Sequence, residues 1–121
     1  RYNIHREEEQ ANRKKPDLTV YMNHSNIRIP IEIKVADRWT QKKLVESLNN
    51  QLVSQYMQGS NSNRGVLLLT YCGEKQYWVY KNTRHYFKDL VQDLNTEAAT
   101  IVKLKNGISN IQVIGVDLTK L

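Results

Sequence analysis

The chain has 121 residues and a mass of 14.2 kDa, which is enough for one domain with a single core and too little for two. Lys and Arg number 18 against 12 for Asp and Glu, so the net charge is +6 and a polyanionic partner is plausible on charge alone. Hydrophobic residues make up 40%, which excludes a disordered tail. No apolar run approaches the roughly 20 residues of a membrane span, and no signal-peptide pattern opens the sequence.

The cysteine count and the first residue set the expected context. Cys72 is the single cysteine, which excludes an internal disulfide and a thiolate metal site and suits a reducing compartment, the cytoplasm. It closes an apolar run, and we expect it to be buried. The sequence begins with Arg1 directly in strand-like residues. We therefore expect residues 1–121 to form one domain that is a piece of a longer protein.

The first third of the chain predicts three strands. Residues 2–4 alternate between apolar and polar before a charged stretch, and a second alternating segment follows over residues 18–22. The period-two run of Ile and Val over residues 27–35 is the clearest strand signal, and a short polar turn joins it to the second strand as a hairpin. Pro30 lacks a backbone donor, so we expect it at an edge, in a bulge or on a flank that faces no partner.

The remainder predicts two helices and further strands. From Thr40 the period changes to that of an amphipathic helix, capped by Asp37 or Thr40 and ended by Gly59. The apolar run over residues 66–69 is typical of a strand buried on both faces. A short strand over 76–80, a second helix over 86–102 and a last strand over 111–116 complete the chain. This order predicts an α/β fold, a small mixed sheet flanked by helices.

Three charged residues are expected to meet on one face of this sheet. Glu32 and Lys34 are two positions apart on one strand and project from the same face. Asp17 opens the preceding strand, and antiparallel pairing can place it opposite Glu32. Two neighbouring carboxylates repel each other unless a hard cation such as Mg²⁺ lies between them. With Lys34 to stabilise a phosphorane, this arrangement suits metal-assisted hydrolysis of a phosphodiester.

The same residues carry a resemblance to a known family. Pro16-Asp17 in the string PDLTVY, followed by Glu32-Ile33-Lys34 in IPIEIKVA, resembles the PD-(D/E)xK phosphodiesterases, the restriction-endonuclease-like superfamily. The helix and the apolar strand that follow fit the same pattern. The resemblance covers residues 1–73 well and the remainder by topology, and it implies a restriction-endonuclease-like core.

The resemblance implies roles for individual residues. Asp17 and Glu32 would be catalytic metal ligands, Lys34 the catalytic lysine, and the main-chain carbonyl of Ile33 a further ligand for Mg²⁺, which Mn²⁺ would replace. An upstream acidic residue often completes the site, and among the glutamates at positions 7–9 we favour Glu7. Some relatives use a Gln followed four residues later by a Tyr. Here Gln51 is followed by Tyr56 after five residues.

Basic residues on both sides of the motif suggest a nucleic acid as partner. Our interpretation favours DNA over RNA, which the motif itself does not distinguish. Those expected to contact it are Lys14, Lys15, Arg38, Lys42, Lys43 and Gln51. The resemblance also implies the effector module of a larger prokaryotic protein of antiviral defence or DNA processing, with homo-oligomerisation left open. Two alternatives remain: a catalytically silent nucleic-acid-binding or assembly module of the same fold, and a metal-free protein-interaction domain with Glu32 and Lys34 as ordinary surface charges.

Overall fold

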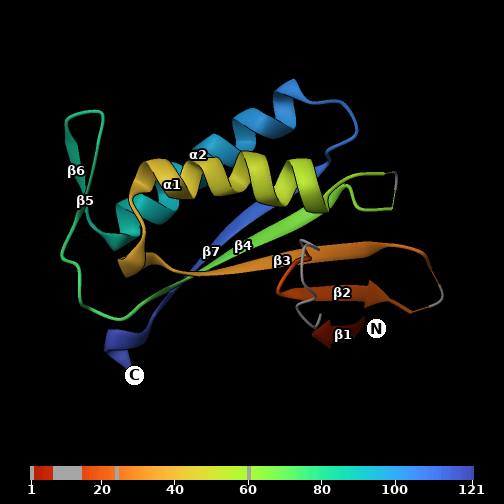
Figure 1. The fold of residues 1–121 in the computed structure, drawn as a ribbon, viewed down its shortest axis with the longest axis horizontal. Helices are drawn as coiled ribbons and strands as arrows, with labels where there is room; N and C mark the ends of the chain where they lie inside the picture. Colours follow the sequence, from red (N-terminus) through yellow and green to blue (C-terminus); the bar gives the residue numbers. More distant parts are fainter. Residues whose placement is uncertain (1, 7–14, 24, 60) are drawn as a thin grey trace.

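The structure, a computed structural model, describes residues 2–6, 15–23, 25–59 and 61–121 (Figure 1). It is an α/β fold built on a mixed five-stranded sheet with the strand order β1-β2-β3-β4-β7. The first three strands are antiparallel, and β3, β4 and β7 are parallel. The strands are β1 (Tyr2–Arg6), β2 (Leu18–Met22), β3 (Arg28–Val35), β4 (Arg64–Tyr71) and β7 (Asn110–Asp117).

The helix that follows β3 changes its winding along its length. A single turn, η1 (Ala36–Arg38), leads into α1 (Gln41–Glu46), whose first turn is capped by the Thr40 hydroxyl, which accepts the Lys43 N–H at 3.1 Å. The helix then continues as a π-helix, η2 (Ser47–Tyr56). The expected helix is present, with Thr40 as its cap, but it ends at Tyr56, before the expected Gly59, and its second part has the wider π winding, which often accompanies functional sites.

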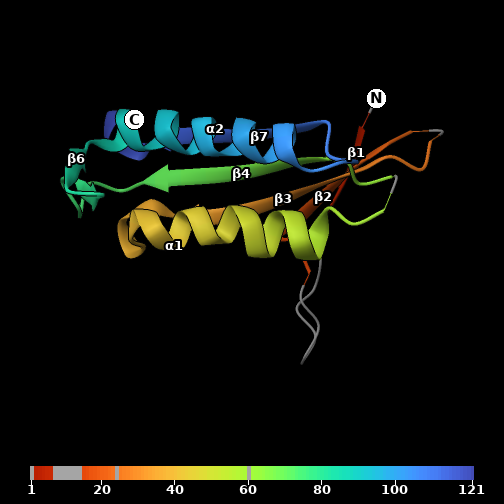
Figure 2. The same ribbon diagram turned by 90° about the horizontal axis from the view of Figure 1, so that it is seen from above.

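Both long helices pack on the same face of the sheet, which we call the covered face. Figure 2 shows α1–η2 and α2 (Phe87–Leu104) side by side with β4 visible between them. Leu67 and Leu69 of β4 are fully buried beneath them. The helices contribute fully buried residues to the same core, namely Leu44, Leu48, Leu52, Leu90, Leu94 and Ala98. Both helices cover one face because each connects two neighbouring parallel strands. The connections from β3 to β4 and from β4 to β7 step across the sheet in the same direction, and right-handed crossovers in one direction place their helices on the same face.

The opposite face, which we call the open face, corrects the expectation for β4. Val66 and Leu68 alternate with the buried leucines and are only half-buried. In the neighbouring β7, Ile114 and Val116 are 43% and 37% exposed. The run over residues 66–69 is therefore buried on one face, because no helix of the described segments covers the other. A continuous apolar run specifies a strand but does not specify what covers it.

A two-stranded sheet lies beside the helices and was only partly expected. It pairs β5 (Trp78–Tyr80) with β6 (Thr83–His85) through a two-residue turn. Lys81 and Asn82 in that turn have positive φ angles of 51° and 62°, as a type I′ hairpin requires. Trp78 is 1% exposed and donates its indole N–H to the carbonyls of Ala36 and Trp39, which fixes the hairpin to the end of β3.

Two further expectations concern single residues. Pro30 lies inside the β2–β3 ladder opposite Thr19, but the pairing of β3 with β4 begins only at Ile31. Of the three places expected for Pro30, the flank is therefore correct: on the side of β3 that faces β4, Pro30 has no paired residue. Cys72 is exposed, so its expected burial is wrong. It lies just after β4, where its backbone N–H donates to the Asp37 carboxylate.

In the described residues no helix is long and apolar enough to span a membrane.

Candidate active site

Asp17 lies at the point where β2 and β3 stop pairing. The antiparallel register joins Thr19 to Pro30 and Leu18 to Ile31, and its continuation by one residue places Asp17 opposite Glu32. At this position the Asp17 side chain takes the place of a backbone acceptor: its Oδ2 accepts the Ile33 N–H at 2.8 Å. The hydrogen bond fixes the Asp17 carboxylate against the edge of β3. The predicted juxtaposition of Asp17 and Glu32 is present.

Glu32 and Lys34 project from β3 onto the covered face and form an ion pair. The Lys34 Nζ lies 3.2 Å from Oε2 of Glu32, and the two side chains are 12% and 6% exposed. The same ammonium lies 4.5 Å from the centroid of the Trp39 ring. Trp39 thus helps to hold Lys34 in place while remaining 36% exposed itself. Glu32 and Lys34 are therefore largely shielded from solvent, unlike an ion pair on an ordinary surface hairpin, which is fully solvated.

The two carboxyl groups interact strongly with each other. Burial raises the pKa of Glu32 from its ordinary value of 4.5 to about 7, and the negative charge of Asp17 and a hydrogen bond between the two carboxyl groups add to the shift. The Lys34 ammonium acts in the opposite direction, and its effect is smaller. Without a cation the pair therefore holds a proton up to near neutral pH. Such closely spaced, repelling carboxylates are the oxygen donors that a hard divalent cation prefers.

A third ligand of the expected set is positioned by strand geometry. In a β-strand the N–H and C=O of one residue point to the same side. Because the Ile33 N–H points to Asp17, the Ile33 carbonyl lies on that side as well, beyond the last β2–β3 pair. Asp17, Glu32 and this carbonyl are the donors that could hold a metal. Within the described segments no group of three or more His, Cys, Asp and Glu side chains forms a metal cluster, and Glu7 lies outside those segments.

Tyr56 is the residue whose place in the site the sequence left open. The sequence offered it as the aromatic partner of Gln51, at a spacing of five residues where the family pattern has four. In the structure, burial and the nearby charges of Glu32 and Asp17 raise the pKa of the Tyr56 hydroxyl to about 12. The π winding explains how it relates to Gln51. The Met57 N–H bonds to the carbonyl of Leu52, five residues earlier, so residues five apart stack along this helix. Gln51 and Tyr56 consequently share a side, as residues four apart do in an α-helix.

The basic residues do not all gather at the site. Lys15 lines a pocket that adjoins it together with Tyr56, whereas Lys14 lies outside the described residues. Arg38, Lys42 and Lys43 are exposed just after β3, and Lys43 lies 3.9 Å from Glu46. Gln51 is half-buried and accepts the Ser47 hydroxyl at 2.7 Å, so its amide oxygen is engaged within the helix.

Comparisons with models of known protein families, with curated proteins and with solved structures find no match for this chain. The motif residues, and the places that the fold gives them, are therefore the basis for assigning a function.

Proposed function

We propose that this domain is a Mg²⁺-dependent nuclease of restriction-endonuclease type that hydrolyses phosphodiester bonds, with DNA favoured as its substrate. One observation carries the proposal. Asp17 and Glu32, which lie 15 positions apart in the sequence, meet as a coupled carboxyl pair beside the Lys34 ammonium. A match of the motif by chance gives no reason for Asp17 to meet Glu32 at a position where the Glu32 and Lys34 side chains are only 6% and 12% exposed. The resemblance extends the proposal to an effector module of a larger prokaryotic protein.

The residues fit a divalent cation and divide the chemistry between them. Asp17, Glu32 and the Ile33 carbonyl are the groups that would hold it, and all three are oxygen donors. Bound there, Mg²⁺ supplies a more acidic water and screens charge on the phosphate. Glu32 must first release its proton, because only the ionised carboxylate is a good ligand. Lys34 directs its ammonium to the phosphate oxygens, whose negative charge grows in the transition state.

Metal binding gives the first test of the proposal. Titration calorimetry at pH 8 with Mg²⁺ and with Mn²⁺ should detect one site in the wild type and none in Asp17→Ala or Glu32→Ala. Glu97→Ala is the matched control, because it removes a carboxylate from α2. Equal binding by Asp17→Ala and the wild type would contradict the assigned ligands.

Cleavage gives the second test and compares the two nucleic acids. End-labelled DNA and RNA of the same sequence should be cut in the presence of Mg²⁺ and left intact in EDTA. The proposal expects the DNA to be cut faster. Cleavage that persists in EDTA, or in Glu32→Ala, would contradict the mechanism. Metal binding without cleavage of either nucleic acid would favour the catalytically silent module of the same fold.

A further inference from the structure

A pocket of about 360 Å³ adjoins the carboxyl pair, between the β2–β3 hairpin and the end of η2. We call it the hairpin pocket. The side chains that matter for its chemistry are Lys15, Thr19, Tyr21, Arg28, Gln55 and Tyr56. Tyr56 lines this pocket and is close enough to Glu32 and Asp17 for their charges to act on its hydroxyl, so the pocket and the carboxyl pair are neighbours.

Strand geometry sets the position of the pocket relative to the site. Thr19 and Tyr21 follow Asp17 at steps of two residues on the same face, and each step is roughly 7 Å along the strand. Their partners across the ladder are Pro30 and Arg28, which line the pocket too. The pocket therefore extends from the carboxylates along the β2–β3 hairpin. If a phosphodiester bond is cleaved beside Glu32, the nucleotides on its two sides extend in two directions from Glu32. One of these directions leads along the hairpin into this pocket.

The lining offers groups for the phosphate and for the base of a nucleotide. Lys15 and Arg28 are cations suited to a phosphate, and no carboxylate lines the pocket. Tyr21 and Tyr56 offer aromatic rings for stacking of a base. The amide of Gln55, on the exposed side of η2, can both donate to and accept from a base edge.

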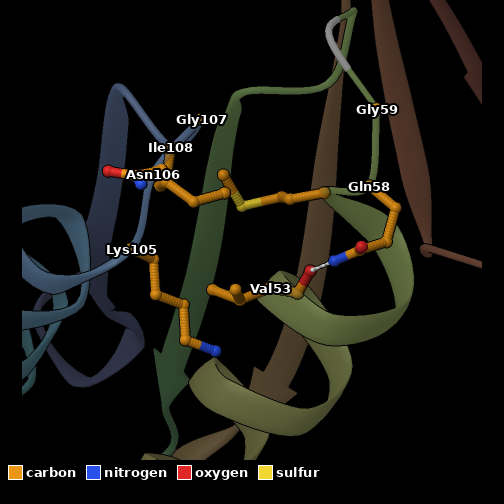
Figure 3. A pocket seen from close by; sticks show the side chains of 8 residues that line it. Val53, Gln58, Gly59, Lys105, Asn106, Gly107 and Ile108 are labelled. Carbon is orange, nitrogen blue, oxygen red and sulfur yellow. Dashed lines mark hydrogen bonds between the residues drawn. The ribbon is translucent and has the colours of Figure 1, made fainter.

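A second pocket, shown in Figure 3, is a useful contrast. It has a volume of about 480 Å³ and lies between the end of η2 and the turn that joins α2 to β7. Val53, Met57 and Ile108 give it an apolar wall, and Lys105 is its single cation. It contains no aromatic side chain. The hairpin pocket therefore combines two cations with aromatic rings and amides, whereas the pocket in Figure 3 has one cation and no aromatic side chain.

We propose that the hairpin pocket binds the nucleotide next to the scissile phosphate, and that it takes this nucleotide from an unpaired strand. A base inside a duplex is stacked and paired, so it can enter a recessed pocket only after it has left the helix. Single-stranded nucleic acid or a frayed end meets this condition without that cost. The inference rests on the proposed nuclease function and specifies its substrate.

Binding without a metal tests the pocket separately from the chemistry. Fluorescence anisotropy in EDTA should show a labelled single strand of DNA binding about tenfold more tightly than the duplex of the same sequence, since stacking of one base accounts for a factor of this order. A single strand of RNA is measured in parallel. Tighter binding of single-stranded DNA or of single-stranded RNA than of the duplex supports the proposed role of the pocket. Whichever single strand binds more tightly identifies the nucleic acid that supplies the nucleotide.

Two variants assign the preference to the pocket. Arg28→Ala should weaken single-strand binding about fivefold or more, because it removes the cation at the far end of the pocket. Arg84→Ala is its matched control, an exposed arginine on the separate β5–β6 hairpin that removes the same charge. Gln55→Trp should fill the pocket without changing the charge and abolish the single-strand preference. Circular dichroism checks that all three variants fold.

Failure of the pocket differs from failure of the nuclease proposal. Equal affinity for duplex and single strand would overturn the proposed role of the hairpin pocket. Equal losses of single-strand affinity in Arg28→Ala and Arg84→Ala would do the same. Cleavage that needs Asp17 and Glu32 but ignores strandedness and Gln55→Trp would also overturn the pocket while upholding the nuclease. Single-strand binding that depends on Arg28 without any cleavage would uphold the pocket and overturn the nuclease.

Discussion

The covered and open faces of the five-stranded sheet are built from alternate residues of the same strands, yet they have different roles. On the covered face β4 contributes the fully buried Leu67 and Leu69, and β3 contributes Glu32 and Lys34. On the open face the same two strands present apolar residues that are only half-buried. Glu32 lies on the covered face, where burial raises the pKa of its carboxyl group, so the cover of the sheet changes the acidity of this group as well as packing the core.

The largest expected effect is on the rate of cleavage, which should depend on a side chain of the covered face and not on its neighbour on the open face. Lys34→Ala should lower the rate of DNA cleavage in Mg²⁺ by about 10³-fold, as expected when a group that stabilises transition-state charge is removed. Val35→Ala changes the next residue of β3, which projects from the open face, and should leave the rate unchanged. Single-turnover cleavage at saturating protein measures both. Equal rates in Lys34→Ala and the wild type would show that Lys34 has no catalytic role.

The second effect compares the faces by packing. Leu67→Ala on the covered face should lower the free energy of unfolding by about 3 kcal/mol, because it leaves a cavity in a fully buried core. Leu68→Ala on the open face should cost about 1 kcal/mol, since its side chain is already half in water. Urea denaturation followed by circular dichroism gives both values. Losses of the same size would mean that the open face is as well buried as the covered one.

The third effect concerns the pH dependence of the covered face. Between its ordinary pKa of 4.5 and its raised value of about 7, Glu32 binds more proton in the folded than in the unfolded state, so stability falls as the pH rises through this range. Glu32→Gln removes this loss and should be more stable than the metal-free wild type at pH 8 by about 3 kcal/mol, with no difference below pH 4.5. Urea denaturation in EDTA at both pH values measures the difference.

Glu46→Gln serves as the control for this pH effect, because its carboxylate lies on α1 and pairs with Lys43 near the surface. It should change stability little at either pH. Saturating Mg²⁺ should reverse the order at pH 8, since it stabilises the wild type and leaves Glu32→Gln almost unaffected. A wild type whose stability does not change between pH 4.5 and pH 8 would contradict the raised pKa of Glu32.

The smallest effect tests the open face directly. Ile114→Lys and Val116→Lys place charges where the wild-type side chains are 43% and 37% exposed, so each should change stability by less than about 0.5 kcal/mol. Both should reduce the fluorescence of a bound apolar dye such as ANS, because they interrupt an exposed apolar surface. A large loss of stability in either variant would show that these positions are packed.

Much of the fold could be predicted from local patterns. Period two identified β2, β3 and β7, and the helical period identified α1–η2 and α2, because one buried face imposes one repeat on the sequence. The turn at Lys81 and Asn82 escaped prediction, since neither residue has the strong preference for positive φ that Gly has. The placement of Asp17 beside Glu32 was predictable, because a hairpin of known register leaves one partner for each residue.

By itself the sequence determined the order along the chain of the two long helices and of the strands of the five-stranded sheet, the alternation within those strands and the three charged residues of the motif. The tertiary structure alone decided that both helices cover one face, that Tyr56 at the end of the π-helix lies near the carboxyl pair, and that the pKa of Glu32 rises to about 7. The physical reason is that burial and the approach of charges depend on elements far apart in the chain, whereas local periodicity records only that a face is buried.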